Sequence, residues 1–189
     1  MLNINNLNNN SGSIIDIFDN VVLDYPDNIA IKLEDGNEVS YKNLNNVADN
    51  IACILYNLIY NEKRDDNDSN TPLVCVMFDR NVGFFASILG ILKANCAYVP
   101  VDPSFPPDRQ SYIFSHSQCR LLLADQDSYN QAIKLGIDIS SCIVIDAGTG
   151  NVIEYINIKA PTSRIENIIR IETQGQQSGI CSLYIRVNW

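Results

Sequence analysis

Apolar positions three and four residues apart recur through the first sixty residues and predict two amphipathic helices. The clearest periodicity spans residues 44–60, and an earlier one follows Ser13 and stops before Pro26. Between these helices, residues 28–33 and 38–41 flank an Asp-Gly turn. Two short apolar segments around such a turn are typical of a β-hairpin.

The rest of the chain alternates between short apolar runs and helical segments. Short apolar runs predict strands at residues 73–78, 98–101, 121–124 and 142–145, and an edge strand at 152–158. The run at 73–78 is continuous and has β-branched members, as expected inside a parallel sheet. Helices are expected at residues 81–94, 107–117 and about 129–135. This alternation predicts an α/β fold with a mainly parallel sheet and flanking helices.

The chain is expected to divide into three parts. Residues 1–12 are rich in asparagine and have too little apolar surface to offset their ordering entropy, so a disordered tail is expected. Residues 13–161 would form the folded unit, with a polar surface loop at 61–70. Residues 162–189 show no clean periodicity and are expected to be a poorly ordered tail.

Charge and cysteine content limit the partners of this protein. The net charge of the 189 residues is −9, and the 13 Lys and Arg form no cluster, which argues against nucleic acid and anionic membranes as partners. No apolar stretch is long enough to span a membrane, and the N-terminus lacks a signal peptide, so a cytoplasmic protein is expected. The six cysteines form no CxxC pair and are expected to be small buried side chains in a reducing compartment.

Residue chemistry alone provides no catalytic constellation. The glycines of 148–150 and 175–179 lack the helix start or the lysine of a phosphate-binding loop and are expected to form ordinary turns. The aspartates of 65–68 are expected to be solvated, and His116 fits a helix surface better than a catalytic base. We therefore assign no catalytic, cofactor-binding or metal-binding residue in this chain.

The most specific segment is GILKANCAYVPVDPSFPPDR, residues 90–109. Lys93 in the last helical turn complements the helix dipole, and Asn95 can adopt the left-handed conformation that ends a helix. Arg109 has two aspartates in reach as ion-pair partners, Asp102 and Asp108. Each of these roles is structural.

This segment resembles an early core motif of adenylate-forming (AMP-binding) enzymes, which are ATP-dependent ligases. The closest resemblance is to the adenylation domains of non-ribosomal peptide synthetases. Three further segments match in the same order: YPDNIAI at 25–31, VSYKNL at 39–44 and FDRN at 78–81. The resemblance covers about residues 14–146 and implies an incomplete N-terminal subdomain of that fold.

The chain also departs from the family pattern. Asn95 stands where Gly is usual, and Asn43 where Glu is usual. The Ser/Thr/Gly-rich loop that holds the ATP phosphates in this family has no counterpart after Arg164, and the catalytic Lys would lie beyond Trp189. The resemblance implies a parent enzyme that uses ATP and Mg to convert a carboxylate, such as an amino acid, to an acyl-adenylate. That enzyme then transfers the acyl group to a phosphopantetheine thiol.

By this reasoning the chain is a truncated adenylation-domain fragment that is inactive alone and binds no cofactor itself. Its expected partners are the remainder of an adenylation domain or a carrier domain. One alternative is a non-catalytic α/β interaction or regulatory module. An unrelated Rossmann-like nucleotide binder is disfavoured because no glycine fingerprint follows a strand.

Overall fold

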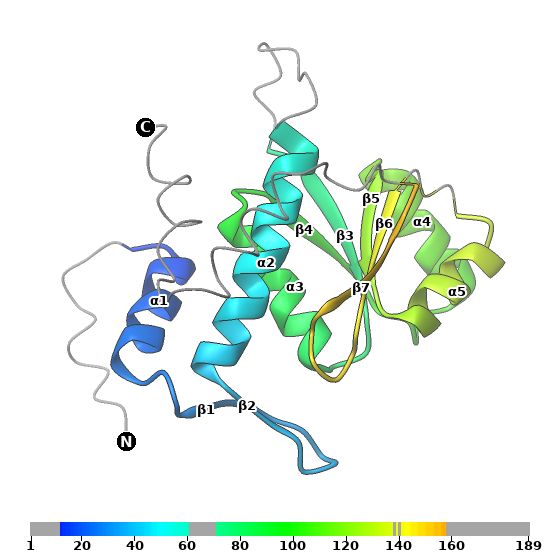
Figure 1. Cartoon of the computed structure of the whole chain (residues 1–189). Coiled ribbons are helices and arrows are strands. Elements are labelled where there is room, and N and C mark those ends of the chain that lie inside the picture. The colour runs from blue at the N-terminus through cyan, green and yellow to red at the C-terminus, as the bar shows by residue number, and fades with distance from the viewer. Residues whose placement is uncertain (1–11, 61–70, 138, 140, 158–189) are drawn as a thin grey trace.

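The computed structural model describes residues 12–60, 71–137, 139 and 141–157 (Figure 1). The expectations for residues 1–11, 61–70 and 158–189 fall outside these residues, so the proposed division into three parts stays a prediction. The helices are α1 (Ile14–Asp24), α2 (Tyr41–Tyr60), α3 (Val82–Lys93), α4 (Pro107–Ser117) and α5 (Gln126–Lys134). The strands are β1 (Ile29–Lys32), β2 (Glu38–Ser40), β3 (Leu73–Met77), β4 (Ala97–Val101), β5 (Leu121–Ala124), β6 (Ser141–Ile145) and β7 (Val152–Ile156).

The main sheet has five strands in the order β4-β3-β5-β6-β7. Strands β3 to β6 pair in parallel, and β7 pairs antiparallel with β6 at one edge. Helices α2 and α3 cover one face and α4 and α5 the other (Figure 1). The predicted α/β class with a mainly parallel sheet is therefore confirmed.

Helices cover both faces of the sheet, and successive side chains of a strand point to opposite faces. On β3, Val74 and Val76 pack in the core beneath α2 and α3, whereas Cys75 and Met77 pack in the core beneath α4 and α5. All four side chains are fully buried. The continuous apolar run of β3 is thus the consequence of a strand covered on both faces.

The β1–β2 hairpin forms a separate two-stranded antiparallel sheet, as its Asp-Gly turn predicts. Gly36 in that turn has a φ of 89°, which favours glycine, and the Asp35 carboxylate accepts the backbone N–H of Asn37. Ile31 is the hairpin residue that enters the core. A two-stranded sheet is marginal alone, so the hairpin depends on this packing.

Helix α3 is apolar nearly all round and begins and ends with well-formed caps. Asn81 caps the start through its side-chain oxygen. At the other end Asn95 has a φ of 56°, its N–H donates to the Leu92 carbonyl, and the Cys96 N–H donates to the Ile91 carbonyl. These two bonds form a Schellman motif, which confirms the predicted left-handed cap.

Three of the described cysteines follow the prediction and two do not. Three of them are buried free thiols: Cys75, Cys96 and Cys142. Cys119 is a free thiol that is only partly buried. For Cys53 the prediction is wrong because this residue is disulfide-bonded, and Cys181 lies outside the described residues.

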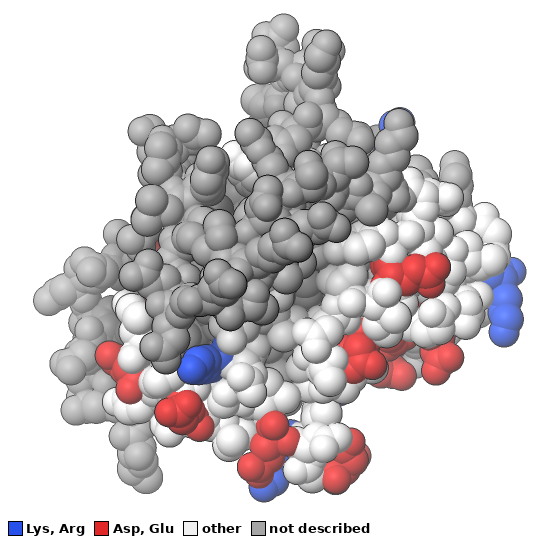
Figure 2. Space-filling model, in the orientation of Figure 1, with Lys and Arg blue, Asp and Glu red and all other residues white. Residues whose placement is uncertain are grey.

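The face shown in Figure 2 carries scattered carboxylates with few cations between them, in keeping with the net charge of −9. No helix among the described residues is long and apolar enough to cross a membrane. The exclusion of nucleic acid as a partner stays a prediction.

Helices α2 and α3 approach closely at Gly90. A Cβ atom at this position would lie 2.6 Å from Ile51 Cγ2 and 3.0 Å from the Ala48 carbonyl oxygen. Real Cβ atoms essentially never come within the shorter of these distances of another heavy atom. The lack of a side chain at Gly90 therefore sets the spacing between the two helices.

Lys93 does more than complement the helix dipole. Its ammonium Nζ lies 2.8 Å from an Asp19 carboxylate oxygen of α1 and 2.8 Å from one of Asp49 of α2. It also donates to the Asn45 side-chain oxygen at 2.9 Å, and the Lys93 side chain is only 9% exposed. Desolvation alone would lower the pKa of Lys93, but the Asp49 and Asp19 carboxylates outweigh it and raise that pKa above its usual value. Burial raises the pKa of Asp49.

We expect Gly90→Ala to destabilise the fold, because the added methyl group forces α3 away from α2. The overpacking should lower the free energy of unfolding by about 1–3 kcal/mol, even though alanine favours a helix over glycine. Urea denaturation followed by circular dichroism measures the change. The control is Gly148→Ala, where the new Cβ would meet only an Asp146 carboxylate oxygen at 3.6 Å. An equal effect of the two variants would contradict this account of helix spacing.

Lys93→Met should lower the free energy of unfolding by about 2–3 kcal/mol, because it leaves two partly buried carboxylates without their cation. Lys134→Met is the matched control, since Lys134 also lies in the last turn of a helix but is exposed. It should change stability by less than about 0.5 kcal/mol. The free energy of unfolding is measured by urea denaturation at pH 7. If Lys93 only complemented the helix dipole, Lys93→Met and Lys134→Met would lower it equally.

The same pair of variants gives a pH dependence. Because the folded pKa of Lys93 is raised, its contribution is fully present below the unfolded lysine pKa of about 10.4 and is lost as pH rises through the folded value. The difference in the free energy of unfolding between wild type and Lys93→Met should therefore narrow above about pH 10. If this difference widens at alkaline pH, the proposed role of the Lys93 charge is contradicted.

Candidate functional site

The sheet topology identifies the candidate site as the carboxyl end of the parallel strands. From β3 the chain leaves through α3 on one face, and from β5 it leaves through α5 on the other. The reversal makes the carboxyl ends of β3 and β5 a topological switch point, the place where ligands of open α/β sheets commonly bind, and we call this place the crevice. Four loops surround the crevice: 78–81, 102–106, 125 and 146–151.

Across the crevice, the first residues of two helices contact each other. Asn81 Nδ2 donates to an Asp125 carboxylate oxygen at 3.2 Å. The other oxygen of Asp125 accepts the Ser128 N–H at the start of α5, while Asn81 caps α3. Both side chains are therefore engaged in holding the helix starts and the two sides of the crevice together.

The loop after β6 is an ordinary turn, as its glycine spacing predicts. Asp146 accepts both the backbone N–H and the hydroxyl of Thr149, at 2.7 and 2.8 Å, and these bonds lower the pKa of the Asp146 carboxyl. Gly150 has a φ of 77°, and a Cβ there would lie 3.0 Å from Val47 Cγ1. Gly150 is therefore needed for the left-handed turn conformation and for the close packing of this turn against α2. The glycines of 175–179 lie outside the described residues, as do the aspartates of 65–68.

The loop after β4 contains the proline-rich part of the most specific segment. The Ser104 hydroxyl and N–H both donate to Asp102, at 2.6 and 2.8 Å, which lowers the pKa of that carboxyl. The Arg109 guanidinium carbon lies 4.1 Å from the centre of the Phe105 ring. The predicted pairing of Arg109 with an aspartate is thus replaced by a cation–π contact.

Gln110, which the sequence analysis did not single out, anchors this loop. Its side chain is fully buried, and its Nε2 donates to the carbonyls of Pro103 and Phe105 at 2.9 and 2.6 Å. Gln131 of α5 donates to the Pro103 carbonyl and to Gln110 Oε1. The sequence contains a weak signal for this role. Prolines have no N–H to donate to the carbonyls of their own loop, and a polar residue, Gln110, stands on the inner side of the helix that follows.

His116 is exposed on the last turn of α4, where its ring stacks on Tyr112 with centroids 5.3 Å apart. The expectation of a helix-surface histidine is confirmed. No nucleophile or carboxylate contact is recorded for it among the described residues.

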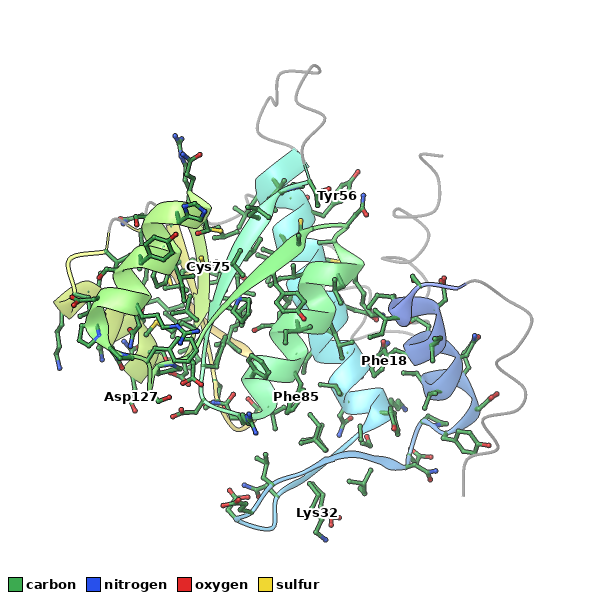
Figure 3. The ribbon with its side chains drawn as sticks, turned by 180° about the vertical axis from the view of Figure 1, so that it is seen from behind. Phe18, Lys32, Tyr56, Cys75, Phe85 and Asp127 are labelled. Carbon is green, nitrogen blue, oxygen red and sulfur yellow. The ribbon has the colours of Figure 1, made fainter. Side chains whose placement is uncertain are left out.

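A largely apolar groove of about 750 Å³ opens beside the crevice. It lies between the β1–β2 hairpin and α3, and Figure 3 shows Phe18, Lys32 and Phe85 around it. Phe85 is 40% exposed, which is high for an aromatic side chain on an otherwise buried helix. Arg80 of the loop after β3 lines the end of the groove nearest the crevice.

The described residues do not fit a nucleotide phosphate or its metal ion. No group of three or more His, Cys, Asp or Glu among them could hold a metal ion. The start of α3 is closed by Asn81 and that of α5 by the Asp125 carboxylate, which repels an anion. We derive no binding step for ATP or Mg from these residues.

Comparison with known proteins decides the family. The family model for AMP-binding enzymes matches residues 18–173. The chain belongs to the AMP-binding enzyme family. It is 31% identical to tyrocidine synthase 1 of Brevibacillus parabrevis over 163 residues, and 30% identical over 125 residues to the nonribosomal peptide synthetase agiA of Aspergillus flavus. The resemblance to non-ribosomal peptide synthetase adenylation domains is therefore confirmed.

Solved structures show the same fold. The crystal structure of IdnL7 matches with a TM-score of 0.56 at 25% identity, covering 72% of this chain and 26% of IdnL7. The N-terminal subdomain of Klebsiella oxytoca NpsA, in complex with 3-hydroxybenzoyl-AMSN, matches with a TM-score of 0.51 at 22% identity. That match covers 61% of this chain and 27% of the subdomain.

The chain spans only a small part of the length of the relatives it matches. The match covers 86% of this chain but 14% of tyrocidine synthase 1, and 66% of this chain but 2% of agiA. It therefore corresponds to part of one adenylation domain.

We expect Gln110→Ala to lower the free energy of unfolding by about 1–3 kcal/mol, because it removes the donor that two loop carbonyls share. Gln126→Ala is the control, since Gln126 is exposed and its side chain donates to the exposed Asn130 side chain at 3.3 Å. It should stay within about 0.5 kcal/mol of wild type. Equal unfolding midpoints for the two variants in urea would show that Gln110 does not anchor the loop.

Proposed function

We propose that this chain supplies the N-terminal scaffold of an adenylation domain. The complete domain would activate a carboxylate, such as an amino acid, with ATP, release pyrophosphate and pass the acyl group to a phosphopantetheine thiol. The observation that carries the proposal is the family match over residues 18–173, supported by the similarity to tyrocidine synthase 1 over 86% of the chain.

The crevice supports a scaffold role for these residues and an inactive isolated chain. Asn81, Asp125 and Asp146 are engaged in caps and turns, so they hold the loops in place and offer little to a substrate. The groups that bind ATP and the carboxylate would then come from the remainder of the adenylation domain. That remainder is the proposed partner, and a carrier domain would follow it in the reaction.

Carboxylate-dependent exchange of pyrophosphate into ATP tests both halves of the proposal. The isolated 189-residue chain should show no exchange above the no-enzyme background with any of the twenty amino acids. Clear exchange would contradict the proposed inactivity.

A chimera tests the scaffold role directly. In tyrocidine synthase 1, only the part that aligns with residues 14–157 of this chain is replaced by those residues, and the parent enzyme serves as the control. The chimera should retain exchange with the parent's own substrate. A chimera that is folded by circular dichroism and inactive would favour the alternative, a non-catalytic interaction or regulatory module.

A further inference from the structure

Two free cysteines lie close together on the α4 side of β3, an interior strand of the sheet. Cys75 lies in the middle of β3 with no exposed surface, on the face toward α4 and α5 (Figure 3). Cys119 follows α4, directly before β5, and is only partly buried. The two cysteine side chains pack in the same core cluster, and both residues contact Ser117.

Ser117 holds the two cysteines in this arrangement. Its Oγ lies 3.8 Å from Cys75 Sγ and accepts the Cys119 N–H at 3.4 Å. Gln118 between them has a φ of 55°, a left-handed turn that brings Cys119 back toward β3. The end of α4, through Ser117 and Gln118, therefore brings Cys119 close to Cys75.

The environments of the two thiols differ. The hydrogen bond to Cys119 and burial raise the pKa of Cys75, whereas the hydrogen bond from Cys75 lowers the pKa of Cys119. Burial raises the pKa of Cys142, another buried free thiol, to about 12, and the Cys96 thiol donates to the Ala94 carbonyl. Cys119 thus combines access to solvent with a neighbour that stabilises its thiolate.

We propose that Cys119 and Cys75 form a peroxide-reactive modification site that closes to an intramolecular disulfide. The Cys119 thiolate attacks one oxygen of a hydroperoxide, breaks the O–O bond and becomes a sulfenic acid, while the departing hydroxide or alkoxide takes a proton. The Cys75 thiol then attacks the Cys119 sulfur, forms the S–S bond and releases water. In sum, two thiols and one hydroperoxide give one disulfide, one water and one further water or alcohol.

Closure would join the α4–β5 connection to the interior strand β3. The linked residues are separated by α3, β4 and α4, so the bond would cross-link a large part of the described fold. A thiol reductant would reverse it. This modification is independent of the adenylation-domain assignment.

Hydrogen peroxide, applied to the reduced full chain in limiting amount, tests the site. After alkylation of the remaining thiols, trypsin should release a linked pair of peptides, 65–80 with 110–120, which dithiothreitol separates. Cys119 should be oxidised about tenfold or more faster than Cys142 and Cys96, whose peptides, 135–159 and 94–109, serve as internal references. Absence of the linked pair, or equal rates at these cysteines, would overturn the proposal.

Variants assign the two roles. Cys119→Ser should abolish the linked pair, and Cys75→Ala should leave Cys119 as a sulfenic acid that a cyclic diketone traps. Cys142→Ala is the matched control, because it also removes a buried thiol from the same core, and it should leave the yield of the pair unchanged. A linked mass that persists in Cys119→Ser would contradict the assignment. If Cys75→Ala fails to fold, the peptide map of the wild-type chain still tests the proposal, because it requires no variant.

Discussion

A single buried ammonium group holds together the helices on one face of this fold. Lys93 lies at the end of α3, where its Nζ bonds to a carboxylate of α1 and to two side chains of α2. One helical turn earlier, Gly90 allows α3 to lie directly against α2. The ion cluster and the close contact therefore act on the same pair of helices. An uncompensated charge and a misplaced helix are both costly there, so the direction of α3 is strongly restrained.

The direction of α3 matters because its first residues reach the carboxyl edge of the sheet. Asn81 closes the start of α3 and contacts Asp125 across the crevice, and Arg80 precedes it at the end of the groove. A change at Lys93, at the far end of the helix, would thus be transmitted to the crevice as a rotation or translation of a rigid element. The early core motif of the family, residues 90–109, in this view contains the parts that fix geometry, not those that touch ligand.

The elements could be predicted from the sequence because their signals are local. Helix periodicity, the Asp-Gly turn and the short apolar runs each lie within one segment, and even the left-handed Asn95 follows from its place after the helix. The contacts of Lys93, Gln110 and the Cys75–Cys119 pair could not be predicted, because each joins residues that are distant in the sequence or depends on an interior position. In isolation, a lysine in a last helical turn looks like a dipole partner, and only the packing of three helices shows the carboxylates around it.

The contrast between local signals and long-range contacts also explains why the family can be identified from the sequence while the ligand-binding residues cannot. The matched motifs encode strands, caps and close helix contacts, which any member needs in order to build this sheet. Binding of a nucleotide requires, in addition, donors that remain free to face a ligand, and the described polar side chains at the crevice bond to one another. Beside them, the groove next to Phe85 is largely apolar and leaves that aromatic side chain partly exposed. The described residues at this end therefore provide geometry, because their polar groups are engaged in caps and turns.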